Sequence, residues 1–328
     1  MTRFASVNTA ISEALHEEML HDDKMLIFGE DMTKEGNVYG LLQGFDYLNE
    51  FGPLRIFDTP ISESGFTGMA VGMAMRGMHP VVEWMYNDFV TVCLDPVVNQ
   101  AAKLRCMTGG QISLPIVFRA PMGMGGRNAA QHSQSLEALF THIPGLKVVC
   151  PSTPKDAKGL LKSAIRDDDP VIFLEHKFLY DTDGELPEGD YVIPLGEADV
   201  KRNGRDITII TYSRQVHYAL EAAEILAKEN IEVEIVDLRT LVPLDWETIK
   251  KSVEKTGRVI TVEEGVRRGG IGGEISAQIC EDLFDSLKAP IKRIASANVV
   301  TSFSPALEDA IFPHPATIVE AAQKMMHS

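Results

Sequence analysis

Short apolar runs alternate with amphipathic stretches along the first half of the chain. Runs with the character of buried strands lie at 24–28, 80–85, 115–120, 146–150 and 170–175. Residues 154–166 show helical spacing of apolar positions, with Thr153 as the expected N-cap and Pro154 in the first helical turn. This alternation predicts an α/β domain with a mainly parallel sheet.

The alternation stops between residues 181 and 206. This stretch is rich in Gly, Pro, Asp and Glu and has no sustained period, so we expect a linker. The pattern then resumes, with expected strands at 206–213, 231–240 and 258–264 and an expected helix at 214–230. The sequence therefore predicts two parallel-sheet α/β domains, residues 1–180 and 207–328, joined by the linker 181–206.

Composition and charge narrow the range of functions. The 328 residues carry a formal net charge of −16, which argues against nucleic acid as a partner. We expect neither a membrane span nor a signal peptide, because no uncharged apolar run reaches about 18 residues. The cysteines have neither CxxC nor metal-ligand spacing. We expect Cys93, Cys106, Cys150 and Cys280 to be buried thiols, and the protein to be cytoplasmic.

A glycine-rich stretch, RRGGIGGEISAQI (267–279), follows an expected strand and opens an expected helix. A GxGxxG motif starting at Gly270 would need a third glycine where the chain has Ile275. An acidic residue about 20 positions further on, which would bind a ribose, is also missing. We therefore expect these glycines to shape a tight turn and not to bind a dinucleotide.

Two polar residues stand in unusual settings. Glu63 precedes a run of glycines, alanines and methionines in which the glycines recur at helical spacing. The pattern alone favours a carboxylate stabilised by a helix dipole, with a catalytic acid as the alternative. His132 follows the glycine-rich residues 123–126. A histidine bonded to backbone is the default interpretation, and only the loop position favours catalysis.

Several stretches, taken together, resemble one enzyme family. They are 58–74 around Glu63, NQAAKLR (99–105), AAQHSQS (129–135), the block 142–180 and VDLRTLVPLD (236–245). The chain is similar over nearly its whole length to the beta subunit of thiamine-diphosphate-dependent 2-oxo acid and acetoin dehydrogenases. This resemblance implies a transketolase-like fold, with a pyrimidine-binding domain followed by a transketolase C-terminal domain.

The resemblance also implies roles for three residues. Glu63 matches the glutamate that binds the aminopyrimidine ring of thiamine diphosphate and helps to activate the cofactor. Phe89 matches an aromatic residue that lies against the pyrimidine; core packing is the alternative interpretation, and the two are compatible. His132 matches a histidine near the thiazolium and the substrate, where it stabilises charge or moves protons.

The other half of the implied site is missing from the chain. Family members hold the diphosphate and magnesium through a Gly-Asp-Gly stretch followed by paired asparagines, and this sequence has neither. The resemblance therefore implies an alpha subunit that supplies this half, in a heterotetramer of two alpha and two beta chains. It also implies transfer of the acyl group to the lipoyl group of a dihydrolipoyl acyltransferase core.

A structural potassium site is a further implication of the resemblance. The family uses backbone oxygens and one polar side chain, which suit a hard cation. The chain reads RDDDP (166–170), so Asp169 stands where an amide is common. A solvated helix end before Pro170 is the alternative interpretation. The matching positions are Ile116, Ala164, Ile165, Asp167 and Asp169.

The sequence leaves the substrate and two rival classes open. Pyruvate and acetoin are about equally favoured, and branched-chain 2-oxo acids come third. A stand-alone enzyme of the transketolase or deoxyxylulose phosphate synthase kind is disfavoured by the chain length and by the missing diphosphate motif. A non-catalytic scaffold subunit is disfavoured because both Glu63 and His132 are present.

Overall fold

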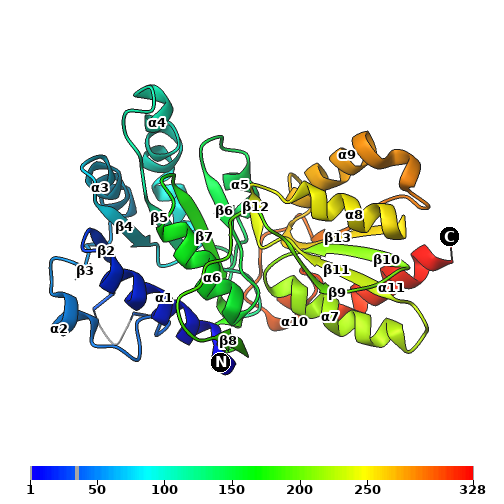
Figure 1. The fold of residues 1–328 in the computed structure, drawn as a ribbon. Coiled ribbons are helices and arrows are strands. Elements are labelled where there is room, and N and C mark those ends of the chain that lie inside the picture. The colour runs from blue at the N-terminus through cyan, green and yellow to red at the C-terminus, as the bar shows by residue number, and fades with distance from the viewer. Residues whose placement is uncertain (1, 34–36, 328) are drawn as a thin grey trace. The chain divides into compact units, whose positions relative to one another are not determined.

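A computed structural model describes residues 2–33 and 37–327. The chain forms two compact units (Figure 1). The first comprises the residues up to Met122 together with Leu139–Leu195. The second comprises Gly123–Ala138 together with the residues from Gly196 onward. The second unit is thus discontinuous in sequence, because a segment from the middle of the chain belongs to it.

The first unit is built on a parallel sheet with the strand order β6-β7-β5-β4-β2-β3. Its strands are β2 (Met25–Gly29), β3 (Ile56–Asp58), β4 (His79–Glu83), β5 (Val117–Met122), β6 (Lys147–Val149) and β7 (Val171–His176). Strands β1 (Thr2–Ser6) and β8 (Asp183–Pro187) form a separate antiparallel pair. The central strands are almost entirely apolar because both of their faces are buried.

Helices and short turns complete the first unit. They are α1 (Val7–His21), α2 (Tyr47–Phe51), α3 (Glu63–Met75), η1 (Asn87–Val92), η2 (Pro96–Ala101), α4 (Leu104–Met107), α6 (Pro154–Ile165) and η3 (Lys177–Leu179). The short helix α5 (Glu137–Thr141) begins in the segment that belongs to the second unit. Helix α6 begins as predicted, since Thr153 Oγ1 accepts the N–H of Asp156 at 3.2 Å and Pro154 follows the cap.

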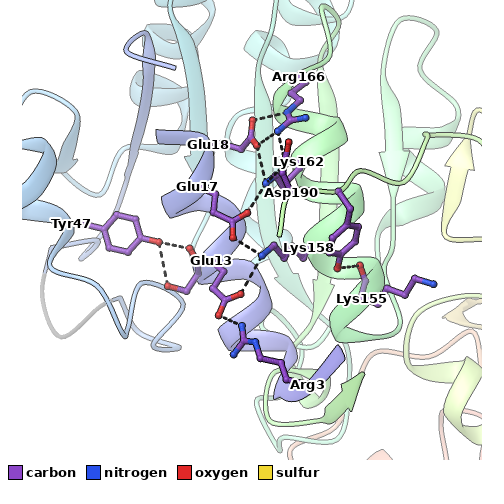
Figure 2. Close-up of polar contacts among 12 residues, drawn as sticks. Arg3, Glu13, Glu17, Glu18, Tyr47, Lys155, Lys158, Lys162, Arg166 and Asp190 are labelled. Atoms are coloured by element: carbon purple, nitrogen blue, oxygen red, sulfur yellow. Dashed lines mark hydrogen bonds and ion pairs between the residues drawn. The ribbon is translucent and has the colours of Figure 1, made fainter. Parts of the chain in front are cut away.

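Helices α1 and α6 pack side by side through a cluster of ion pairs, shown in Figure 2. The side chains of Lys158 and Lys162 are 2% and 1% exposed, and each donates to Glu17 at 2.6 Å. Arg166 donates to both oxygens of Glu18 at 2.9 and 2.7 Å. Buried ions are tolerated only when they are paired in this way, so the cluster determines how the two helices align.

The second unit contains a sheet with the order β14-β13-β10-β11-β9. Its strands are β9 (Asp199–Arg202), β10 (Ile207–Thr211), β11 (Val233–Asp237), β13 (Val259–Val266) and β14 (Lys292–Ser296), and β12 covers Thr240–Val242. Only β9 runs antiparallel to its neighbour within this sheet. In Figure 1, α8 (Trp246–Thr256) and α9 (Ile271–Leu283) cover one face, and α7 (Arg214–Ala227) and α11 (Pro315–Met326) cover the other. Two short elements, η4 (Phe284–Ser286) and α10 (Pro305–Asp309), complete the unit.

The predicted fold class is confirmed, whereas two details of the sequence interpretation change. The stretch 181–206 contains the strands β8 and β9, although it lacks a sustained pattern. The cysteines are all free, but only Cys93 and Cys150 are buried, so the expectation is wrong for Cys106 and Cys280. No helix in the described ranges 2–33 and 37–327 has the length and apolarity needed to cross a membrane. The domain limits 1–180 and 207–328 stay a prediction.

The glycine-rich turn before α9 accommodates a carboxylate of the chain itself. Gly270 is the N-cap, and the N–H of Gly272 donates to both oxygens of Glu263 at 3.3 and 3.2 Å. A Cβ atom at Gly270 would lie 2.7 Å from these oxygens, so a side chain there would force the carboxylate of Glu263 to move. Burial raises the pKa of Glu263 to about 7. The glycines shape a tight turn, as predicted.

Candidate active site

Glu63 is the first residue of α3, and its side chain is buried at 7% exposure. Its helix begins after Ser62, which makes no side-chain capping bond. Glu30 follows directly after β2 and is also buried. Burial and then the nearby charge of Glu63 raise the pKa of Glu30. The two carboxylates are therefore near enough for their charges to interact, and Glu30 stands at the carboxyl edge of the parallel sheet, where ligands of such sheets bind.

Two buried polar atoms at this edge of the sheet lack a partner in the described part of the chain, one on Glu30 itself and one on Thr59. Glu30 Oε1 and Thr59 Oγ1 are buried and have no hydrogen-bond partner among the residues that the structure describes. Thr59 lies beside the end of β2, because its N–H donates to the carbonyl of Gly29 at 2.8 Å. Buried polar atoms without partners are costly, and they are commonly satisfied by a ligand or an ordered water. The donor and acceptor set fits the polar edge of an aminopyrimidine ring.

Phe89 lies in η1, which packs against α3. Its ring is half-buried and meets the ring of Tyr86 edge-on, with 5.7 Å between centroids and an interplanar angle of 78°. Tyr86 in turn contacts the ring of Tyr39 at 6.0 Å and the ammonium group of Lys177 at 5.0 Å. Phe89 is thus part of an aromatic cluster beside Glu63's helix. This position permits both the implied cofactor contact and simple packing.

A buried charge network that the sequence analysis missed lies in the sheet itself. Arg119 on β5 is fully buried and donates to both oxygens of Glu175 on β7, at 2.8 and 2.9 Å. It also donates to Glu83 on β4 at 3.1 Å, and Asn37 donates to the other oxygen of Glu83 at 2.7 Å. Burial raises the pKa of Glu83 to about 7, although the charge of Arg119 opposes this effect.

A sequence signal for this network did exist. Glu83, Arg119 and Glu175 are charged residues inside otherwise apolar strands, and neighbouring strands bring them together. Glu30 could have been found in a similar way, because it is an acidic residue at the carboxyl end of an apolar strand.

His132 belongs to the second unit, whereas Glu63 and Phe89 belong to the first. It is half-buried and lies in the segment 123–138, whose conformation is closed by a bond from the N–H of Gly123 to the carbonyl of Gln134 at 3.1 Å. Ser133, its neighbour, is buried and lines a cavity of about 180 Å³ within the second unit. His132 therefore lies near the point where a compact loop closes.

The carboxylates of the implied potassium site are already paired with basic side chains. Lys147 Nζ lies 2.7 and 2.6 Å from the two oxygens of Asp167. Arg105 Nη1 lies 2.5 Å from Asp169 Oδ1. These ion pairs occupy both carboxylates, and the potassium site stays a prediction. The other members of the set, Ile116, Ala164 and Ile165, are buried and have only backbone oxygens to offer.

Comparisons with known proteins match both units. Residues 5–182 match the model of the transketolase pyrimidine binding domain, and residues 196–318 match that of the transketolase C-terminal domain. The chain is 51% identical to the acetoin:2,6-dichlorophenolindophenol oxidoreductase subunit beta of Cupriavidus necator, over 99% of this chain and 98% of that one. The chain belongs to the family of transketolase-like dehydrogenase beta subunits that includes this relative.

Other relatives of this family differ in their named substrate. The Bacillus subtilis acetoin:2,6-dichlorophenolindophenol oxidoreductase subunit beta is 46% identical, over 99% of this chain and 98% of its own. The pyruvate dehydrogenase E1 component subunit beta of Rickettsia felis is 45% identical, over 98% of both chains. A solved split-gene transketolase, described as an inactive beta4 tetramer, has a TM-score of 0.80 at 23% identity, over 98% of both chains. That likeness shows the shared transketolase-like fold.

Proposed function

We propose that this protein is the beta subunit of a thiamine-diphosphate-dependent enzyme that cleaves acetoin or pyruvate and passes the acyl group to a lipoyl acceptor. The observation that carries the proposal is the buried pair Glu63 and Glu30, with partnerless polar atoms beside it. An ordinary helix start would leave such a carboxylate exposed to solvent. Family membership then gives the chemistry that this arrangement serves.

The residues of this chain would bind the pyrimidine end of the cofactor. When bound, thiamine diphosphate supplies a thiazolium carbon that attacks the carbonyl carbon of the substrate. Glu63 would hold a proton at the ring nitrogen of the aminopyrimidine, and its burial strengthens that hydrogen bond. Phe89 would pack against the ring. His132 would stabilise charge or move protons at the substrate during acyl transfer.

We assign the diphosphate and magnesium ligands mainly to an alpha subunit, because the sequence lacks both motifs that would supply them. The exposed face of α3 suits such a partner. Cβ atoms added at Gly68 and Gly72 would meet nothing within 4 Å, and Met69 and Met75 are exposed on the same helix. Small residues let another backbone approach closely. The assembly of two alpha and two beta chains on a dihydrolipoyl acyltransferase core is part of this proposal.

Acetoin is the substrate that we place first. The acetoin-type relative from Cupriavidus necator is 51% identical to the chain, and the pyruvate-type relative from Rickettsia felis is 45% identical. Pyruvate remains the second candidate because both types cover almost the whole chain. Branched-chain 2-oxo acids come third, and the relatives named above include no branched-chain enzyme.

The test is reconstitution with the alpha chain that co-purifies from the source. The complex is given acetoin, pyruvate and a branched-chain 2-oxo acid in turn, with 2,6-dichlorophenolindophenol and then a lipoyl domain as acceptor. We expect turnover with acetoin or pyruvate only in the presence of the alpha chain. Turnover by the isolated beta chain would support the stand-alone enzyme instead, and a complex inactive with all three substrates would contradict the proposal.

Calorimetry provides an independent check on the two-subunit site. The isolated chain should bind thiamine diphosphate with magnesium weakly or not at all, because the sequence lacks both motifs that would bind the cofactor's charged end. Tight binding to the isolated chain would overturn the assignment of that half to the alpha subunit. The exposed variant Glu320→Gln serves as the control for charge and handling, since Glu320 pairs with Lys324 on the surface of α11.

A further inference from the structure

Residues 123–135, here called the His132 loop, are held by carboxylates that come from distant parts of the chain. Glu308 on α10 is fully buried. Its oxygens accept the N–H of Gly125 at 2.9 Å and the N–H of Arg127 at 3.1 Å. The guanidinium of Arg127 also donates to Glu308 at 2.6 Å and to both oxygens of Asp309 at 2.8 and 3.0 Å. One carboxylate thus binds three donors of the loop.

A second carboxylate holds the loop at its two ends. Glu264, at the end of the buried part of β13, accepts the N–H of Met124 at 2.6 Å and the hydroxyl of Ser135 at 3.4 Å. Arg214 donates to the carbonyl of Met124 at 2.9 Å. These contacts secure the ends of the loop. Glu308 instead accepts hydrogen bonds from Gly125 and Arg127, which lie between Met124 and His132 in the sequence.

The backbone of the loop needs such support. Arg127 and Ala129 have φ angles of +58° and +61°, in the left-handed region that side-chain-bearing residues rarely adopt. Such a conformation is strained, and it persists only where the surroundings impose it. The backbone N–H groups of Gly125 and Arg127 donate the two hydrogen bonds to Glu308, so these bonds hold the backbone at the strained residue Arg127 itself.

We infer that Glu308 is a positioning residue for His132, acting through the backbone of the His132 loop. This inference rests on the proposed function, in which His132 acts on the substrate during acyl transfer. Hydrogen bonds from backbone N–H groups to a buried carboxylate are strong and directional. They keep the loop in one conformation before substrate arrives. Loss of the negative charge at residue 308 weakens all three bonds at once.

The decisive experiment is a double-mutant cycle in the complex reconstituted with the alpha chain. The variants are Glu308→Gln, His132→Ala and the two combined, and the readouts are acyl transfer to a lipoyl domain and deuterium exchange at the thiazolium carbon. Glu308→Gln should slow transfer by roughly 10- to 100-fold through misplacement of His132. It should leave exchange nearly unchanged. In the His132→Ala background it should have little further effect on transfer.

Several outcomes overturn the inference, and they differ from failure of the proposed function. If the two substitutions slow transfer additively, Glu308 does not act through His132. If Glu308→Gln transfers acyl groups normally while His132→Ala does not, the positioning role is wrong and the proposed function stands. If His132→Ala itself transfers normally, the proposed role of His132 fails, and the inference fails with it.

Two further variants keep the test interpretable. If Glu308→Gln does not assemble, Arg127→Gln loosens the same contact from a side chain that is 34% exposed, and it should show the same non-additivity with His132→Ala at a smaller amplitude. Glu320→Gln removes an exposed carboxylate of the same unit and should leave transfer unchanged. Amide hydrogen exchange at Gly125 and Arg127 should speed up in Glu308→Gln, and unchanged protection there would contradict the contact itself.

Discussion

Glu83 gives a sharp prediction about the pH dependence of stability in the first unit. Its pKa is raised from an ordinary value of 4.5 to about 7, first by burial and also by the charge of Glu175. Between these two values the folded state holds a proton that the unfolded state releases. The free energy of unfolding therefore falls as the pH rises through this range, and the full cost is present above about pH 7.

The size of the effect follows from the two pKa values. Each pH unit between them corresponds to about 1.4 kcal/mol, so Glu83 should cost the fold about 3 kcal/mol at pH 8 relative to pH 4. Glutamine resembles the protonated acid and does not titrate. The free energy of unfolding of Glu83→Gln minus that of the natural chain should therefore rise by about 3 kcal/mol over this range. Titrating groups that do not interact with Glu83 cancel in this difference.

The assay uses the two tryptophans of the chain. Trp84 is fully buried in the first unit, where its indole donates to Thr67 at 2.9 Å, and Trp246 lies in the second. In a Trp246→Phe background, urea unfolding followed by fluorescence reports on the first unit alone. Measurements at half-unit steps from pH 4.5 to 8.5 give the difference in the free energy of unfolding between Glu83→Gln and the natural chain. Parallel stability curves across this range would refute the reasoning.

Three further predictions concern packing and assembly. Lys162→Met should destabilise the first unit by about 1.5 to 3 kcal/mol in urea unfolding, because Glu17 loses one of its two lysine donors in the α1–α6 cluster, whereas the exposed Lys324→Met should cost under about 0.5 kcal/mol. Thr153→Ala should cost about 1 kcal/mol by loss of the α6 cap, with Thr153→Ser near neutral; equal losses in both would contradict the capping role. Gly68→Ala should stabilise the isolated chain by about 0.8 kcal/mol and weaken binding of the alpha chain in ultracentrifugation; unchanged binding would place the interface elsewhere.

Local patterns predicted the elements whose environment is uniform along the chain. The apolar runs at 115–120 and 170–175 correspond to β5 and β7, because a strand with both faces buried is mostly apolar, here apart from the paired Arg119 and Glu175. The start of α6 was predicted from Thr153 and Pro154, which act on neighbouring backbone groups only. Such signals are contained within a few residues of the element that they determine.

Features set by distant contacts were not predictable in the same way. Strand β8 lies in the irregular stretch 181–206 and is held by pairing with β1 at the other end of the unit. The segment 123–138 joins the second unit because carboxylates at Glu264 and Glu308 bind its backbone. No periodicity within either segment encodes these partners.

The candidate site shows the same contrast between local sequence signals and contacts between distant segments. Glu63 and His132 were selected by resemblance to a family, because their local patterns favoured structural interpretations. Glu30 was missed, since its electrostatic interaction with Glu63 joins two segments that are separate in the sequence. Arg119 was missed because a lone arginine in an apolar run gives no indication of which strands supply its partners.

The measurement that tests the central claim most directly is deuterium exchange at the thiazolium carbon of thiamine diphosphate in the complex with the alpha chain, comparing Glu63→Gln with the natural chain. Glutamine fills the same space but cannot hold and release the proton. The account predicts intact assembly and cofactor binding, with exchange slowed by at least roughly 100-fold, and an unaltered rate in the Glu320→Gln control. Exchange at the natural rate in Glu63→Gln would contradict the account.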